Sequence, residues 1–168
     1  AVGLDVRVGQ LHGMAQRGGS VEALVLLGPG QSTFIGDGEA DVVFGLEPLE
    51  TLRALPRMRS DTRVLVSSGK VVPFSMVRDG LQYPPLDEVY AQIRAVTAQL
   101  HVVDAPALLE QARAPRSLNI CMLGALANLD VLPVSEPDLW AAVEKRIPSK
   151  HLDANRKAYE LGMAAVAG

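Results

Sequence analysis

The sequence predicts a single α/β domain built around a largely parallel β-sheet. Short apolar segments that suit buried strands alternate with segments whose apolar residues recur every three or four positions, as in amphipathic helices. Strands and helices that alternate in this way form layered α/β domains. The chain has 168 residues and contains no internal repeat or low-complexity linker. A domain of this length buries roughly 70% of its unfolded surface, which is enough for a core of its own.

Two strands are expected near the N-terminus. Residues 2–8 alternate loosely between apolar and polar side chains. Val21–Leu27 has apolar residues at alternating positions and also at Leu24 and Leu26, so the middle of this strand is apolar on both sides. That pattern predicts a strand inside a sheet that is covered on both faces.

The next segment predicts a strand, a helix and a second strand. Residues 41–45 form a short apolar run, and Pro48 can open the following helix because the first helical turn does not require its N–H. Leucines at positions 46, 49, 52 and 55 would face the core, and Pro56 ends the helix. Arg63–Ser67 is predicted to be a buried strand. Residues 73–85 contain three prolines and a glycine, which predicts a long irregular connection suited to lie over a partner.

The C-terminal half is predicted to be mainly helical. Asp87, Ser135 and Ser149 are side chains of the kind that cap helices, and Ser135 forms a capping-box pattern with Asp138. A strand over residues 101–104 leads into a helix opened by a proline. The helix that Asp87 is expected to cap is clearly amphipathic, with apolar side chains at Leu86, Val89, Tyr90, Ile93, Val96 and Leu100.

A further helix carries few charges and is predicted to be buried nearly all round. Gly124 lies inside it, which indicates close contact with another element. Its apolar residues include Leu118, Met122, Ala125, Leu126 and Leu129.

The composition is that of a globular domain and argues against several functions. Hydrophobic residues make up 48% and charged residues 21% of the chain. The net charge of −3 and the aromatic content of 4% argue against binding to nucleic acid or to an anionic membrane surface. Cys121 is the single cysteine, so no internal disulfide or cysteine-rich metal site is expected, and a reducing cytoplasmic location is inferred. No apolar run approaches the ~20 residues that cross a bilayer.

Most residues with reactive side chains stand alone in the sequence. His12, His101 and His151 lack the short helical spacing of a metal-binding pair. Cys121 lies on the apolar helix, where we interpret it as a small buried side chain. The triplet Gly36-Asp37-Gly38 matches the start of a magnesium and thiamine diphosphate motif. The asparagine that this motif requires does not follow, so we interpret the triplet as a surface turn.

Two polar residues have more than one interpretation. Glu47 stands at the carboxyl end of a predicted strand, where ligands gather in open α/β sheets. It can equally stabilise the N-terminus of the following helix through its charge. Asn119 begins the apolar helix, and its amide can either cap that helix or reach into a shared interface.

The polar loop of residues 12–20 is the strongest candidate for binding. Gly13, Gly18 and Gly19 permit positive φ angles and close approach of another molecule. Arg17 offers a permanent charge and a forked donor suited to a carboxylate or a phosphate. An ordinary connection between two strands, with an exposed arginine, is the alternative.

Several segments resemble one protein family. The run HGMAQRGGSV, which starts at His12, resembles the signature loop of the gamma domain of 2-oxoacid:ferredoxin oxidoreductases, and most of all the beta subunit of the indolepyruvate branch. Residues 39–50 resemble the family's strand followed by a helix opening in Glu-Pro, residues 119–126 its glycine-containing helix, and residues 148–162 its tail. The resemblance implies one gamma-type domain over residues 1–168, layered α/β/α like domain III of pyruvate:ferredoxin oxidoreductase. The family's N-terminal glycine-rich strand–turn–helix is expected to be missing from this chain.

The resemblance implies a subunit with no catalytic residue or cofactor of its own. A larger alpha subunit would hold thiamine diphosphate, magnesium and iron–sulfur clusters. The complex would oxidatively decarboxylate a 2-oxoacid with coenzyme A, giving an acyl-coenzyme A, carbon dioxide and reduced ferredoxin. Indolepyruvate or another arylpyruvate is the preferred substrate, with pyruvate, 2-oxoglutarate and branched-chain 2-oxoacids as alternatives. The residues expected to contact a ligand or the partner are His12, Gly13, Met14, Gln16, Arg17, Gly18, Gly19, Glu47 and Asn119.

A second hypothesis comes from another class of function. The chain would then be a non-enzymatic binding or scaffold protein that keeps the gamma-domain fold and uses the loop for protein contact only. Under either hypothesis, an isolated chain can pair with itself as a homodimer through the surface that a partner would cover.

Overall fold

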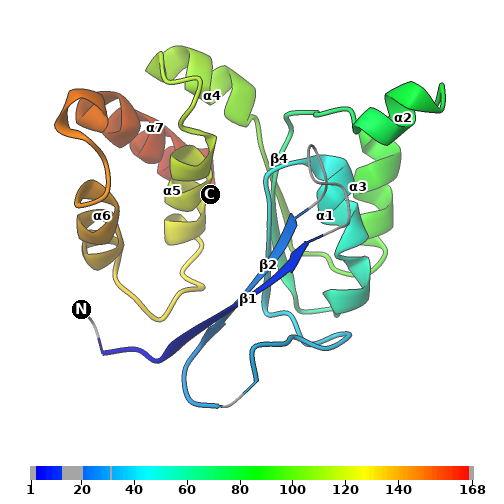
Figure 1. Cartoon of the computed structure of the whole chain (residues 1–168), viewed down its shortest axis with the longest axis horizontal. Coiled ribbons are helices and arrows are strands. Elements are labelled where there is room, and N and C mark those ends of the chain that lie inside the picture. The colour runs from blue at the N-terminus through cyan, green and yellow to red at the C-terminus, as the bar shows by residue number, and fades with distance from the viewer. Residues whose placement is uncertain (1–2, 13–20, 31, 167–168) are drawn as a thin grey trace.

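The computed structural model describes residues 3–12, 21–30 and 32–166, which form an α/β fold (Figure 1). The strands are β1 (Val6–His12), β2 (Val21–Leu27), β3 (Val42–Gly45), β4 (Arg63–Ser67) and β5 (Leu100–Val103). The helices are α1 (Pro48–Arg53), α2 (Phe74–Arg78), α3 (Leu86–Arg94), α4 (Ala105–Ala112), α5 (Leu118–Asn128), α6 (Glu136–Glu144) and α7 (Leu152–Ala165). Short 3₁₀ helices cover Leu55–Arg57 and Ser149–His151.

The central sheet is parallel, with the strand order β3-β4-β5. Val43 pairs with Val64, and Val66 pairs with Val102. The middle strand is completely buried at Val64, Leu65 and Val66. A parallel strand with helices on both faces has no side in solvent, which explains the continuous apolar run that predicted it.

Helices cover both faces of this sheet (Figure 1). On one face, Val64 and Val66 of β4 pack with Val89 and Ile93 of α3, beside α1. On the other face, Leu65 packs in the core that α4, α5 and α7 share. The layered arrangement with a parallel sheet is therefore confirmed.

Helices α5 and α7 cross in close contact at two glycines. A Cβ atom added to Gly124 would overlap with the carbonyl oxygen of Tyr159, and one added to Gly162 would overlap with the carbonyl oxygen of Cys121. Each glycine therefore lets the opposite backbone approach where no side chain fits. The prediction that Gly124 marks close contact with another element is confirmed.

Helix α6 packs against α7 through aromatic side chains. The Trp140 ring lies with its centroid 5.0 Å from that of Tyr159, and the Arg156 guanidinium stacks 4.6 Å above the Trp140 ring. The Ser135 hydroxyl accepts the N–H of Asp138 at 3.3 Å. The predicted start of this helix is confirmed, because that hydrogen bond satisfies one of the free donors of the first turn.

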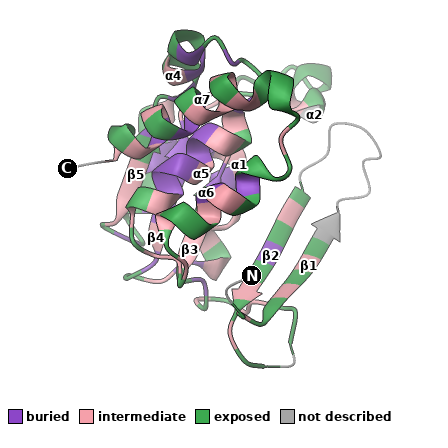
Figure 2. Cartoon of the chain, turned by 90° about the vertical axis from the view of Figure 1, so that its left-hand side faces the viewer, coloured by how far each residue is buried: buried purple, intermediate pink, exposed green. Residues whose placement is uncertain are grey.

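Strands β1 and β2 form a separate antiparallel ribbon beside the body of the protein (Figure 2). Along β2, Leu24 is 5% exposed, whereas its neighbour Val25 is 52% exposed. The prediction of a strand inside a covered sheet was therefore wrong. Apolar residues on both sides of a strand do not reveal which side the rest of the chain covers. The first strand also differs from residues 2–8, since it begins at Val6 and continues to His12.

The predicted irregular connection over residues 73–85 contains the short helix α2. The carbonyl oxygen of Pro73 accepts the N–H groups of Met76 and Val77 and so starts this helix. A proline is tolerated there because the first turn of a helix does not need its N–H. The prolines and the glycine of this segment predicted turns, so the sequence did not indicate this helix.

Two predicted helix caps were wrong. Pro85 occupies the cap position of α3, so Asp87 lies within the first turn, where its charge still favours the helix dipole. Ser149 lies in the 3₁₀ helix that precedes α7, and His151 takes the cap position without a side-chain hydrogen bond. In both cases helical structure, α-helical or 3₁₀, already includes the residue that was predicted to be the cap.

Candidate functional site

The strands of the parallel sheet end together at one edge, and polar side chains follow each of them. Glu47 comes two residues after β3, Ser68 and Lys70 follow β4, and Asp104 follows β5. Figure 1 shows this edge at the end of the molecule where α1 begins and where α2 and α4 lie. Ligands of open parallel sheets bind at such an edge, so it is the candidate site.

Glu47 is the most buried carboxylate of this edge, with 7% of its surface exposed. Its Oε2 accepts the N–H of Glu50 at 2.8 Å, which makes Glu47 the N-cap of α1. Its Oε1 accepts the hydroxyl of Tyr83 and the N–H of Val71 at 3.4 Å. The interpretation of Glu47 as a helix-terminus residue is thus confirmed. The same carboxylate also holds the connection between β4 and α3 against the sheet edge.

Tyr83 belongs to the candidate site, although the sequence did not indicate it. Its hydroxyl donates to Glu47 and accepts the N–H of Leu49 at 3.1 Å. Burial, together with the hydrogen bond to the Glu47 carboxylate, raises the pKa of Tyr83 well above its ordinary value. Lys70 stands 5.6 Å above the Tyr83 ring. No local pattern in the sequence signals this contact, because Tyr83 and Glu47 are 36 positions apart.

The remaining polar residues of the edge serve the fold. The buried Ser67 hydroxyl accepts the N–H of Gly69 at 3.2 Å. The Ser68 hydroxyl donates to Asp104 at 3.2 Å, and Asp104 caps α4 by accepting the N–H of Ala107. Among the described residues, no hydrogen bond links Ser67 or Ser68 to a histidine. The described residues of this edge offer positioned hydrogen-bond groups.

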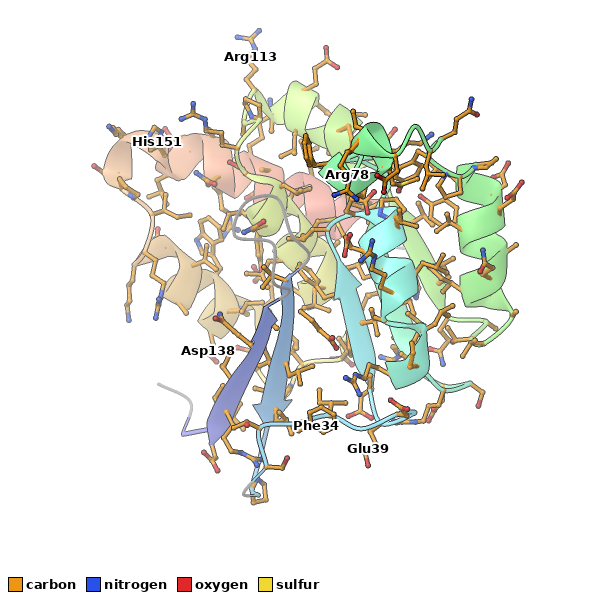
Figure 3. All side chains as sticks on the ribbon, turned by 45° about the vertical axis from the view of Figure 1, so that its right-hand side comes forward. Phe34, Glu39, Arg78, Arg113, Asp138 and His151 are labelled. Atoms are coloured by element: carbon orange, nitrogen blue, oxygen red, sulfur yellow. The ribbon has the colours of Figure 1, made fainter. Side chains whose placement is uncertain are left out.

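The binding loop predicted from the sequence lies almost wholly outside the described residues. His12 is the last residue of β1 and pairs with Val21 at the start of β2. β1 runs toward the end of the molecule at which the parallel strands finish (Figures 1 and 3). The predicted contact residues outside the described part of the chain are Gly13, Met14, Gln16, Arg17, Gly18 and Gly19.

Asn119 does not cap α5. The cap position belongs to Ser117, and Asn119 lies two residues further along, inside the first helical turn. The side chain is exposed, and no hydrogen bond between described residues uses it. Its contact with a partner stays a prediction.

The triplet Gly36-Asp37-Gly38 forms a surface turn, as the sequence predicted. Gly38 has φ +69°, a conformation that glycine adopts without strain. The Asp37 carboxylate pairs with Arg57 at 3.1 Å. Within residues 3–12, 21–30 and 32–166, no three His, Cys, Asp or Glu side chains come together as a metal site.

Two histidines lie in separate parts of the fold. His101 is a half-buried residue of β5. His151 is exposed and precedes α7, on the side of the molecule away from α2 and α3 (Figure 3). Neither shares a described hydrogen bond with a residue of the candidate site.

Cys121 is completely buried, and burial raises the pKa of its thiol to about 11. We therefore expect no reaction with a thiol-reactive dye in the native protein at pH 8, and full reaction after denaturation, because the thiolate is the reactive form. The folded-state pKa lies above the unfolded-state value of 9.0, so folding favours the protonated thiol. This stabilisation is complete below pH 9 and is lost as the pH rises toward 11. Rapid labelling of the native protein would contradict the prediction.

None of the helices in the described ranges is long and apolar enough to span a membrane.

The fold and the edge define a class of protein: a layered α/β domain whose parallel sheet ends in a hydrogen-bonded edge beside an antiparallel ribbon. The pattern of the pyruvate ferredoxin/flavodoxin oxidoreductase family matches residues 1–165, and the chain belongs to this family.

Known proteins similar to this chain agree with that membership. Indolepyruvate oxidoreductase subunit IorB of Methanothermobacter thermautotrophicus is 35% identical over 164 residues, which cover 98% of this chain and 84% of the relative. The subunit of the same name from Archaeoglobus fulgidus is 35% identical over 160 residues, covering 95% of this chain and 80% of the relative. The crystal structure of a keto/oxoacid ferredoxin oxidoreductase gamma subunit from Geobacter sulfurreducens has the same fold, with a TM-score of 0.66 at 20% identity. The aligned part covers 98% of this chain and 81% of the gamma-subunit chain. The resemblance inferred from the sequence is confirmed.

Proposed function

We propose that this chain is the cofactor-free subunit of a 2-oxoacid:ferredoxin oxidoreductase that acts on indolepyruvate or another arylpyruvate. The observation that carries the proposal is the likeness to proteins named indolepyruvate oxidoreductase subunit, which extends over 98% and 95% of the chain in two relatives. A likeness of this extent includes both the sheet edge and the strands that lead into the glycine-rich loop.

The cofactors belong, in this proposal, to a larger alpha subunit. The described residues gather no metal ligands, and the one cysteine is buried in the apolar helix α5, so they do not fit a metal ion or an iron–sulfur cluster. Thiamine diphosphate with magnesium and the iron–sulfur clusters of the alpha subunit would supply bond cleavage and electron transfer. The products would be an acyl-coenzyme A, carbon dioxide and reduced ferredoxin.

This chain's own contribution is to complete the site that the alpha subunit provides. The glycines of the loop permit close approach to the partner, and Arg17 binds an anionic group of the substrate or of coenzyme A. Glu47 and Tyr83 hold the connection between β4 and α3 at the sheet edge, where Lys70 adds a positive charge. Asn119 is available on the surface for contact with the partner. The chain alone is not expected to be active.

Purification of this chain with its natural partners tests the proposal. A tagged chain captured from its own cells should bring down a protein with thiamine diphosphate and iron–sulfur clusters. The captured complex should reduce a viologen dye when a 2-oxoacid and coenzyme A are added, with an arylpyruvate as the best substrate of a panel. Capture of the chain without such a protein, or of a complex without 2-oxoacid-dependent activity, would contradict the proposal and favour a scaffold function.

The Arg17→Ala variant is expected to lower the activity of the assembled complex about 10- to 100-fold, because a charge-assisted hydrogen bond contributes about 1.5–3 kcal/mol. Activity is measured by dye reduction after the complex has been shown to assemble with normal stoichiometry. Arg146→Ala is the matched control, since Arg146 is exposed after α6 and has no proposed role. Normal assembly with full activity would show that Arg17 does not contact a ligand.

A further inference from the structure

The two ends of the connection between β4 and α3 meet at a single atom. We call residues 71–83 of this connection the strap. Glu47 Oε1 accepts the N–H of Val71 at 3.4 Å, at the start of the strap, and the hydroxyl of Tyr83 at its end. Surface loops of about 6–16 residues whose ends lie close together are Ω-loops, and the strap has this form.

The middle of the strap is held together by its own hydrogen bonds. The carbonyl oxygen of Pro73 accepts the N–H groups of Met76 and Val77, and the carbonyl oxygen of Met76 accepts the N–H of Leu81 at 2.9 Å. Figure 1 shows helix α2, which forms in this part, at the end of the molecule where α1 begins. Because these bonds stay within the strap, its middle can keep its form when its ends move.

The hydrogen bonds between the strap and the rest of the described chain all involve Glu47 or Tyr83. Besides its bond to Glu47, the Tyr83 hydroxyl accepts the N–H of Leu49 at 3.1 Å. Among the described residues, no other hydrogen bond leads from the strap to another segment, and no residue of the strap belongs to an apolar core cluster. Lys70, which precedes the strap, lies 5.6 Å from the centre of the Tyr83 ring. The attachment of the strap is therefore concentrated at its two ends.

The carboxylate that joins these ends is fully used in the observed state. Its Oε2 accepts the N–H of Glu50 and caps α1, while its Oε1 holds the strap. Loss of the Oε1 bonds would release both ends of the strap together, because they share one acceptor. The cap of α1 can remain during this release, since it uses the other oxygen.

We propose that the strap is a lid on the edge of the parallel sheet, latched by Glu47 and Tyr83, and that it opens as one unit. Opening frees Glu47 Oε1 and the N–H of Leu49 at the edge where ligands of open parallel sheets bind. Lys70 loses its place over the Tyr83 ring in the same step. Lids over binding sites are segments of low local stability, which a loop attached mainly at its ends provides. The proposal concerns this chain alone and holds for any substrate or partner.

Native-state hydrogen exchange of the full chain, followed residue by residue by NMR, tests the latch. In the wild type, the amides of Val71, Met76 and Leu81 should share one opening constant, which is the ratio of the open to the closed population. That constant should exceed the value for the amides of β4, which exchange only when the domain unfolds. The Tyr83→Phe variant should raise it about 3- to 10-fold at all three amides, because it removes the hydrogen bond of the latch.

Tyr159→Phe is the matched control, because it removes the same hydroxyl from a tyrosine that packs against Trp140, outside the strap. The strap amides should exchange in this variant as in the wild type. Faster exchange of Val71 alone in Tyr83→Phe, with Met76 and Leu81 unchanged, would show that the ends fray separately and would overturn the proposal. Wild-type strap amides that exchange as slowly as those of β4 would also overturn it, since the strap would then open only with the whole domain.

Discussion

Replacing Gly124 by alanine is expected to lower the free energy of unfolding by about 3 kcal/mol. The added Cβ would overlap with the carbonyl oxygen of Tyr159, which belongs to the backbone of α7 and cannot rotate away. Relief requires α5 and α7 to separate, and the loss spreads to the core that both helices share. For a domain of this size the melting temperature should fall by about 6–12 °C, measured by circular dichroism.

The control for this prediction lies on the same helix. Asn128 is exposed at the last position of α5, so Asn128→Ala should change the free energy of unfolding by no more than about 0.5 kcal/mol. Gly162→Ala should resemble Gly124→Ala, because its Cβ would meet the backbone of α5 at the same crossing. A Gly124→Ala protein with wild-type stability would show that the two helices do not cross as described.

The Glu47→Ala variant is expected to lose about 2–4 kcal/mol of stability. Removal of an N-cap costs about 1 kcal/mol, and the partly buried Tyr83 hydroxyl, left without its acceptor, adds about 1–3 kcal/mol. The connection between β4 and α3 should also loosen, because Glu47 binds both Tyr83 and the N–H of Val71. Urea unfolding measures the first effect, and limited proteolysis between residues 70 and 83 measures the second.

Two further variants separate the roles of Glu47. Glu47→Gln keeps one acceptor oxygen, which can replace either the Oε2 that caps the helix or the Oε1 that binds Tyr83, so it should cost less than Glu47→Ala but more than no change. Tyr83→Phe removes only the hydroxyl and should cost about 0.5–1.5 kcal/mol. The double variant Glu47→Ala/Tyr83→Phe should cost less than the sum of the two single changes, because both remove the same hydrogen bond. Strict additivity would mean that the two side chains do not interact.

The parallel sheet could be predicted because its strands are short apolar runs that indicate burial by themselves. β4 is apolar on both sides and completely buried at Val64, Leu65 and Val66, so pattern and environment agree. Pro48 and Pro106 marked helix starts because proline suits the first turn. Gly124 indicated a helix contact because glycine is unfavourable in a helix without a packing reason.

The ribbon and the sheet edge could not be predicted in the same way. A strand pattern shows which residues share a side but not which side is covered, so Val25 and Leu24 were placed in the same kind of environment. The contact between Tyr83 and Glu47 joins residues 36 positions apart, and no local spacing encodes it. Asn119 showed that a residue suited to capping must also stand at the right position of the helix.

The subunit assignment is tested most directly by adding this chain back to an alpha subunit purified without it. The rate of arylpyruvate-dependent viologen reduction is measured as the amount of added chain increases. The proposed function predicts little activity from either protein alone, and a rate that rises with the added chain and levels off when every alpha subunit has bound one. Full activity of the alpha subunit alone, or no gain in rate when it is saturated with the chain, would contradict that assignment.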